Sequence, residues 1–249
     1  MNSGPTPRFS LIVPAHNEQS YLGRLLESAD IARSRCRFGA AAVEVVVADD
    51  GSTDATSAIA EQWGCRVVRL AARRIAAARN AGAAVATGDI LSFADADMRV
   101  HPETFNAIDD MLGSGRIVAG ATGVTLERWS LGLAVTYALM VPWIWLLRMD
   151  TGVVFCRAPD FRAVGGFDER RSFGEDVQFL LDLRRLGRPR GQRLGRARRT
   201  KAIASTRKFD RYGDWHYFPM LFRLLGPMLR SPSARNALVE DYWYRDPAR

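Results

Sequence analysis

The sequence has few cysteines, and nothing at its N-terminus has the pattern of a targeting segment. Its three cysteines are Cys36, Cys65 and Cys156, and their spacing matches no metal-binding motif. Three cysteines cannot build a disulfide framework, which favours a reducing compartment. The apolar run after Arg8 stops at Pro14, too soon for a signal peptide, so we expect a cytoplasmic protein. No internal repeat is present, which excludes a solenoid.

The common glycine-rich nucleotide motifs are also missing. Neither G-x-G-x-x-G after the first apolar run nor G-x-x-x-x-G-K-[ST] occurs. Nucleotide binding, if present, must therefore depend on carboxylates and a metal ion. The composition, 47% hydrophobic and 25% charged over 249 residues, is close to globular averages and makes disorder improbable. The length predicts one domain, or one domain with a tail.

Acidic residues are absent from one basic stretch, residues 184–201. This stretch holds nine basic residues, while the whole chain has a net charge of only +8, so the basicity is local. It is either a surface for anionic lipid or a solvated loop. It contains no aromatic residue, which argues against nucleic-acid binding. The basic residues are Arg184, Arg185, Arg188, Arg190, Arg193, Arg196, Arg198, Arg199 and Lys201.

Short apolar runs alternate with helical patterns in the first half of the chain. Residues 9–15 and 43–48 are β-branched runs typical of buried parallel strands. A helix is expected from Glu18 onward, with Asn17 as its cap. This alternation predicts an α/β fold with a doubly wound, mostly parallel sheet and helices on both faces. Further helices are expected at 53–63, 74–86, near 102 and at 175–186, and further strands at 66–70, 89–94, 117–121 and 152–156.

Acidic residues follow two of the predicted strands, where open α/β sheets bind ligands. Asp50 begins the turn D-G-S-T-D and can accept hydrogen bonds from a base or a ribose, although turn and cap chemistry alone also explains this motif. Asp49 still belongs to the strand and is expected to be structural. Asp95 and Asp97 form a D-x-D pair whose oxygens suit Mg²⁺ or Mn²⁺; a loop or cap is the alternative.

Basic and acidic residues on two helices complete the candidate set. Arg74 and Arg79 are placed to pair with a diphosphate, or else to lie on a solvated helix face. Glu175 and Asp176 open an apolar helix, where the helix dipole stabilises acids. A carboxylate there can also take a proton from an acceptor hydroxyl.

Five motifs in unbroken order resemble those of the family 2 glycosyltransferases of GT-A fold. They are S-L-I-V-P-A-H-N-E, V-V-V-A-D-D-G-S-T-D, A-R-N-A-G-A-A-V-A-T-G-D-I-L-S-F-A-D-A-D, G-G-F-D-E and G-E-D-V. The resemblance covers residues 8 to about 187. Because the Q-x-x-R-W motif of processive synthases is absent, the chain resembles the small, non-processive bacterial members of the family. It implies an inverting, metal-dependent transferase that uses a UDP- or GDP-type sugar donor with Mg²⁺ or Mn²⁺.

The resemblance also implies roles for individual residues. Asp97 would bind the metal, Asp95 would lie near the ribose or the ion, and Asp176 would be the general base. Arg74 would approach the nucleoside or the diphosphate. The residues expected to hold the nucleoside are Pro14, Ala15, Glu18 and Asp50.

Residues 129–147 carry no charge, and their length just reaches that of a membrane span. A simple crossing is rejected, because it would separate Asp97 from Asp176. We expect a buried helix, or a helix at the membrane interface or against a lipid acceptor, where Trp143 suits a headgroup or a sugar face. The protein would then be peripheral to the membrane's inner face.

The resemblance also bears on the C-terminal segment. Arg207 and Lys208 resemble an S-x-R-[RK]-[FW] stretch and would meet the diphosphate or an acceptor phosphate, or form a basic surface loop. Glu175 is a further candidate for contact with the diphosphate or the acceptor. His216 is either a metal ligand or an ordinary packed or exposed imidazole.

The predicted organisation is a catalytic domain over residues 1–206 and a helical, aromatic tail over 207–249. Within the domain, residues 8–97 would bind the nucleotide and residues 98–206 the acceptor, which is a glycan, a lipid-linked molecule or a small molecule. Two other functions stay open: a catalytically silent GT-A scaffold that binds nucleotide, and a basic protein that binds nucleic acid or an anionic surface.

Overall fold

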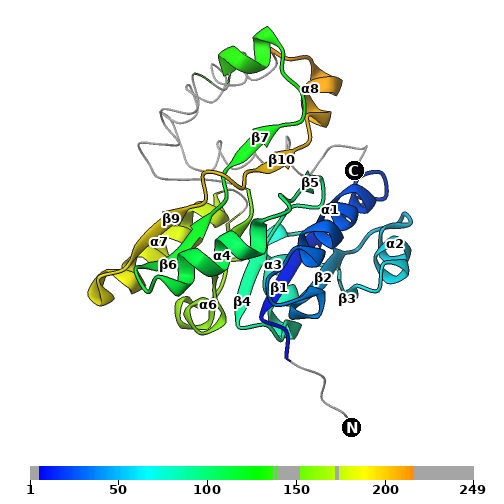
Figure 1. Cartoon of the computed structure of the whole chain (residues 1–249). Coiled ribbons are helices and arrows are strands. Elements are labelled where there is room, and N and C mark those ends of the chain that lie inside the picture. Colours follow the sequence, from blue (N-terminus) through cyan, green and yellow to red (C-terminus); the bar gives the residue numbers. More distant parts are fainter. Residues whose placement is uncertain (1–5, 137, 139–151, 172–173, 216–249) are drawn as a thin grey trace.

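A seven-stranded sheet forms the centre of the computed structural model, which describes residues 6–136, 138, 152–171 and 174–215 (Figure 1). Its strand order is β3-β2-β1-β4-β8-β6-β9. Only β8 runs antiparallel to its neighbours, so the sheet is mostly parallel, as predicted. The strands are β1 (Phe9–Ala15), β2 (Val43–Asp50), β3 (Arg66–Leu70), β4 (Ile90–Phe93), β6 (Ile117–Ala121), β8 (Val154–Arg157) and β9 (Arg193–Arg196).

Helices cover both faces of this sheet. Successive residues of β1 point to opposite faces, so Leu11 and Val13 belong to one hydrophobic core and Ile12 to the other. The first core contains α1 (Leu22–Ser34), α2 (Thr56–Gln62) and α4 (Thr104–Gly113). The second contains α3 (Ile75–Val85), α6 (Ala158–Val164) and α7 (Glu175–Gly187). The predicted doubly wound α/β architecture is therefore confirmed.

A second, three-stranded sheet brings distant segments together beside the large one. It consists of β5 (Met98–Arg99), β10 (Ala202–Ala204) and β7 (Val124–Leu126), in the order β5-β10-β7 (Figure 1). In the antiparallel pairing of β10 with β5, Ala204 lies opposite Met98. The short helix α8 (Arg207–Tyr212) starts soon after β10 and therefore returns to the segment that carries Asp97.

The first helix begins later than expected. It starts at Leu22, not at Glu18, and no side chain caps it. Asn17 has a positive φ of 52° and accepts a hydrogen bond from the Thr53 N–H at 2.8 Å through its side chain. The prediction of Asn17 as a cap was therefore wrong, because this amide joins the turn after β1 to the turn after β2.

Part of the basic stretch forms regular structure, so the expectation of a solvated loop was wrong there. Arg188–Arg190 is a 3₁₀ turn, η2, and Arg193–Arg196 is the edge strand β9. Charged residues on an edge strand discourage pairing with another chain. Within the stretch, Arg185 forms an ion pair with Asp182 and Arg190 forms one with Asp160. A second short 3₁₀ turn, η1, covers Ala40–Ala42.

Only the start of the uncharged segment is described. Residues 131–136 are helical, with Leu133 and Thr136 buried and Leu131 exposed. Trp143 and His216 lie outside the described residues, as does most of the tail. Among the helices that are described, none has the length and apolar character needed to cross a membrane.

Gly88 lies just before β4, against the backbone of β1. A Cβ atom there would lie 2.7 Å from the carbonyl carbon of Phe9 and 2.8 Å from the backbone nitrogen of Ser10. We expect Gly88→Ala to lower the free energy of unfolding by about 1–3 kcal/mol through overpacking. Gly23, in α1, has no atom within 4 Å of such a Cβ. Gly23→Ala should raise the free energy of unfolding by up to about 1 kcal/mol through helix propensity. Urea unfolding of both variants checks this, and equal effects would contradict the packing shown here.

Candidate active site

Three neighbouring strands present their carboxyl ends at one edge of the sheet. Pro14 and Ala15 are the last, buried residues of β1, and Asp50 ends β2. Asp95 and Asp97 follow β4, on the other side of β1. All three strands are parallel, so these polar residues come together at the same edge, where α/β folds bind ligands.

Asp50 is buried and binds the backbone of the residues that lead into α3. Its two carboxylate oxygens accept hydrogen bonds from the backbone N–H groups of Arg73 at 2.8 Å and Arg74 at 2.6 Å. Asp49 accepts bonds from the Ser52 N–H and the Ser57 hydroxyl, which is the structural role expected for it. In this structure Asp50 therefore shapes the backbone. Its predicted contact with the nucleoside is untested.

Arg79 is the central ion-pairing residue of the site. It is buried within α3, and its guanidinium donates to Glu175 and to Asp95, both at 2.9 Å. The guanidinium also lies 5.2 Å from the centre of the Phe167 ring. One buried side chain therefore joins the end of β4 to the first turn of α7.

This arrangement differs from the expected diphosphate contacts of Arg79 and Glu175. Both side chains are only 10% exposed, and each uses the other as its partner. Burial raises the pKa of Glu175, while the positive charge of Arg79 opposes that rise. The two residues are far apart in the sequence, so no local pattern indicated their pairing.

Asp176 lies next to this ion pair, in the first turn of α7. One of its oxygens accepts a hydrogen bond from the Val177 N–H at 2.8 Å. Its negative charge contributes to the raised pKa of Glu175 and also acts on Arg79. The ion pair of Arg79 thus brings Asp176 to the same site as Asp95.

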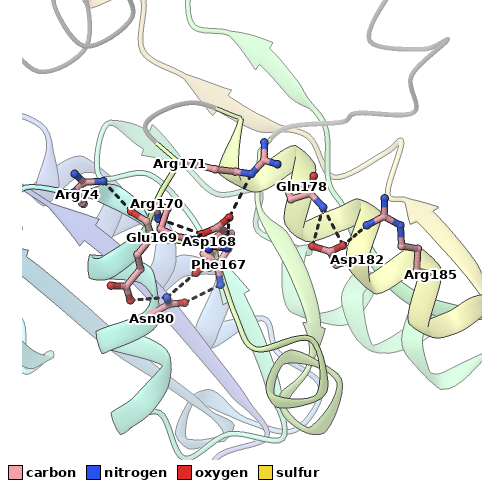
Figure 2. A network of polar contacts seen from close by, with 10 residues as sticks. All are labelled: Arg74, Asn80, Phe167, Asp168, Glu169, Arg170, Arg171, Gln178, Asp182 and Arg185. Atoms are coloured by element: carbon pink, nitrogen blue, oxygen red, sulfur yellow. Dashed lines mark hydrogen bonds and ion pairs between the residues drawn. The ribbon is translucent and has the colours of Figure 1, made fainter. Parts of the chain in front are cut away.

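Residues of α3 also hold the loop that precedes α7 (Figure 2). The Asn80 side chain donates to the Phe167 carbonyl at 2.9 Å and accepts from the Phe167 N–H at 2.9 Å. Arg74, which was expected near the nucleoside, donates to the Glu169 carbonyl at 2.9 Å. A Cβ at Gly166 would lie 2.7 Å from Asn80 Oδ1, so this close approach needs a glycine. The loop before Asp176 is therefore positioned by α3.

Arg207 reaches the site from α8. Its two terminal nitrogens donate to the two oxygens of Glu18, at 2.7 and 2.8 Å, and its Nε lies 3.1 Å from Asp97 Oδ2. Burial acts to lower the pKa of Arg207, but the hydrogen bonds with Glu18 and the charge of Asp97 raise it overall. Lys208, the next residue of α8, is partly buried. Two residues expected to bind the donor and the metal thus share one cation here.

The donor set is compatible with a divalent cation that also binds substrate. The described part of the chain has no group of three or more His, Cys, Asp or Glu side chains that could hold a metal. Enzymes that act on phosphorylated substrates commonly bind Mg²⁺ through one or two carboxylates together with the substrate phosphates. Asp95 uses only Oδ1 in its ion pair with Arg79. The pair Asp95 and Asp97 therefore suits a site that a bound diphosphate would complete.

The doubly wound sheet, with acids after β4 and at the start of α7, defines a domain of the GT-A class. The mannosyltransferase PcManGT from Pyrobaculum calidifontis, solved with GDP-Man and Mn²⁺, matches with a TM-score of 0.62 and 20% identity, over 80% of this chain and 56% of that one. S. aureus TarS 1-349, solved with UDP-GlcNAc, matches with a TM-score of 0.61 and 20% identity, over 80% and 58% of the two chains.

Sequence comparison identifies the family. Residues 10–130 match the model of glycosyl transferase family 2, and the chain belongs to this family. It is 33% identical over 128 residues to an undecaprenyl-phosphate 4-deoxy-4-formamido-L-arabinose transferase of Pseudomonas paraeruginosa, covering 49% of this chain and 37% of the relative. It is 29% identical over 202 residues to the pre-mycofactocin glycosyltransferase of Mycobacterium tuberculosis, covering 73% and 40%. The chain thus matches less than half the length of these relatives.

Replacement of Arg79 tests its role as the link between β4 and α7. Arg79→Met would leave Glu175 and Asp95 without their shared cation, and Glu175 is buried. We expect a loss of about 3–5 kcal/mol in the free energy of unfolding, measured by urea titration. Arg185→Met removes an exposed ion pair with Asp182 and should cost at most about 1 kcal/mol. Similar losses in the two variants would argue against the proposed link.

Proposed function

We propose that this protein is an inverting glycosyltransferase that moves a sugar from a nucleotide-diphosphate sugar to a hydroxyl acceptor. The observation that carries the proposal is the ion pair of Arg79 with Asp95 and Glu175, both at 2.9 Å. It brings the expected metal-binding acids and the expected base, Asp176, to one site. The activity requires this juxtaposition, because one carboxylate must act on the acceptor while the other acids hold the donor.

The donor would bind at the carboxyl ends of β1, β2 and β4. The nucleoside would contact Glu18, Asp50 and Arg74, with Pro14 and Ala15 beneath it. Asp95 and Asp97 would hold Mg²⁺ or Mn²⁺, as fits two carboxylates that share a cation with phosphates. When bound, that ion would offset the negative charge that develops on the departing diphosphate.

Asp176 would then accept the proton of the acceptor hydroxyl. As the proton leaves, the acceptor oxygen forms a bond to the anomeric carbon on the face opposite the diphosphate. The bond between that carbon and the diphosphate oxygen breaks, and its electron pair leaves with the diphosphate. A single displacement of this kind inverts the anomeric configuration and needs no covalent intermediate.

The basic residues of α8 would act on the phosphates. Arg207 and Lys208 would contact the diphosphate or a phosphate of the acceptor. We retain the division into a nucleotide-binding half (8–97), an acceptor-binding half (98–206) and a tail (207–249). The tail is coupled to the first half, since Arg207 contacts Glu18 and Asp97.

The relatives bear on the class of the acceptor. One relative is named for undecaprenyl phosphate, which supports a lipid-linked acceptor and contact with a membrane surface through the basic stretch. Structures with UDP-GlcNAc and with GDP-Man support either a UDP or a GDP donor. A catalytically silent nucleotide-binding scaffold is the second candidate. The complete set of acids argues against it, because a scaffold has no use for a base.

Asp176→Asn tests the general base. The amide cannot accept the proton, so we expect kcat to fall by about 10²–10⁴-fold while the free energy of unfolding and nucleotide binding stay close to wild type. Asp182→Asn, later on the same helix, is the matched control and should keep wild-type turnover. Sugar transfer at the wild-type rate by the Asp176 variant would rule out this base.

The donor and the metal can be tested together by thermal unfolding. We expect one of UDP, GDP or TDP to raise Tm by several degrees when Mn²⁺ is present, because binding to the folded state stabilises it. EDTA should abolish the shift. Failure of every nucleotide to raise Tm would contradict donor binding, whereas a shift without any transfer would favour the silent scaffold.

A further inference from the structure

Arg207 occupies the position where the donor and the metal are expected to bind. Its guanidinium donates to both oxygens of Glu18 and lies 3.1 Å from Asp97 Oδ2. The Tyr21 ring lies beneath it, 4.9 Å from the guanidinium carbon to the ring centre. The side chains of Arg207 and Glu18 are 18% and 8% exposed, so water screens this ion pair only weakly. The inference that follows rests on the proposed function.

Ion pairs hold the short helix that carries Arg207 both at its start and at its end. At its start, Arg207 binds Glu18 and Asp97. At its end, Arg128 pairs with Asp210 and with Asp214, both at 2.6 Å. The pairs made by Arg128 are more exposed than those made by Arg207. Loss of the contact to Asp97 would therefore leave α8 attached through Arg128 and Glu18.

Charge explains why Arg207 lies between Glu18 and Asp97. Glu18 and Asp97 are two carboxylates that face the same guanidinium, and like charges this close need a cation between them. A divalent ion at Asp97 would supply that charge and would repel the guanidinium at the same carboxylate. An arriving diphosphate would bring further negative charge, which a guanidinium binds through paired hydrogen bonds.

We propose that Arg207 is the resident cation of the donor-free site. When a divalent cation binds to Asp97, Arg207 loses its contact with that carboxylate. Its guanidinium then binds the incoming diphosphate. Arg207 thus opposes the metal when the metal comes alone and supports the diphosphate when both are present. This makes α8 a positioning element that responds to the donor complex.

The test is whether one substitution changes two affinities in opposite directions, strengthening the binding of Mn²⁺ and weakening the binding of pyrophosphate. The full chain and Arg207→Gln are titrated with Mn²⁺ alone, followed by electron paramagnetic resonance of the free ion. We expect Arg207→Gln to bind Mn²⁺ at least about fivefold more tightly, because a competing cation is gone. Pyrophosphate is then titrated into each protein with Mn²⁺ present. Here the same variant should bind at least about fivefold more weakly.

Two controls separate this exchange from general effects. Arg24→Gln removes a neighbouring positive charge that pairs with Glu127 and does not contact Asp97, so both affinities should stay within about twofold of wild type. Hydrogen exchange needs no variant. In the wild-type chain, Mn²⁺ alone should speed exchange of the Asp210 amide, which bonds to the Thr206 carbonyl at 2.9 Å within α8.

The outcomes are distinguishable. Equal Mn²⁺ and pyrophosphate affinities in the wild type and in Arg207→Gln, with no change in exchange at α8, would overturn the proposal and leave the proposed function intact. Absence of Mn²⁺ binding from both proteins would overturn the proposal together with the metal dependence of the proposed function. Weaker binding of both probes by Arg207→Gln would make Arg207 a general structural residue and would also overturn it.

Discussion

The buried ion pairs of Arg79 are the constraint on which the site depends. A guanidinium with 10% exposure loses most of its hydration, and two carboxylates replace that hydration. Those carboxylates come from the end of β4 and from the start of α7. Their shared partner therefore sets how close the acids after β4 come to Asp176. A change in either segment alone would remove one of the two carboxylate partners of this buried guanidinium.

The second sheet imposes a similar constraint on the other side. The pairing of β10 with β5 places Ala204 opposite Met98, and this register brings Arg207 to Asp97. The beginning of the C-terminal segment is thus part of the candidate site, so the expected boundary at residue 206 falls between residues that contact one another there. Two arginines of the site differ in their surroundings, since Arg79 is buried between its partners and Arg207 lies beside the expected donor.

Several elements could be predicted because their signals are local. The spans of β1, β3 and β6 agree with the expected strands, since short runs rich in apolar residues are visible in the sequence. The strand β9 was missed because its sequence, Arg-Leu-Gly-Arg, carries charges at an exposed edge. The start of α1 was misplaced because Asn17 and Glu18 form contacts with distant residues, Thr53 and Arg207, and these contacts override the local capping pattern.

The order and spacing of the acidic motifs was enough to indicate the family and the types of group at the site. Each of these motifs consists of neighbouring residues at the end of a strand or in the first turn of a helix. It can therefore be recognised from a short stretch of sequence. The pairing of these groups was decided by the tertiary structure alone. Glu175 and Arg207 each have a partner far away in the sequence. The packing of α3 and α7 in one core brings Glu175 to Arg79, and the register of β10 on β5 brings Arg207 to its partners.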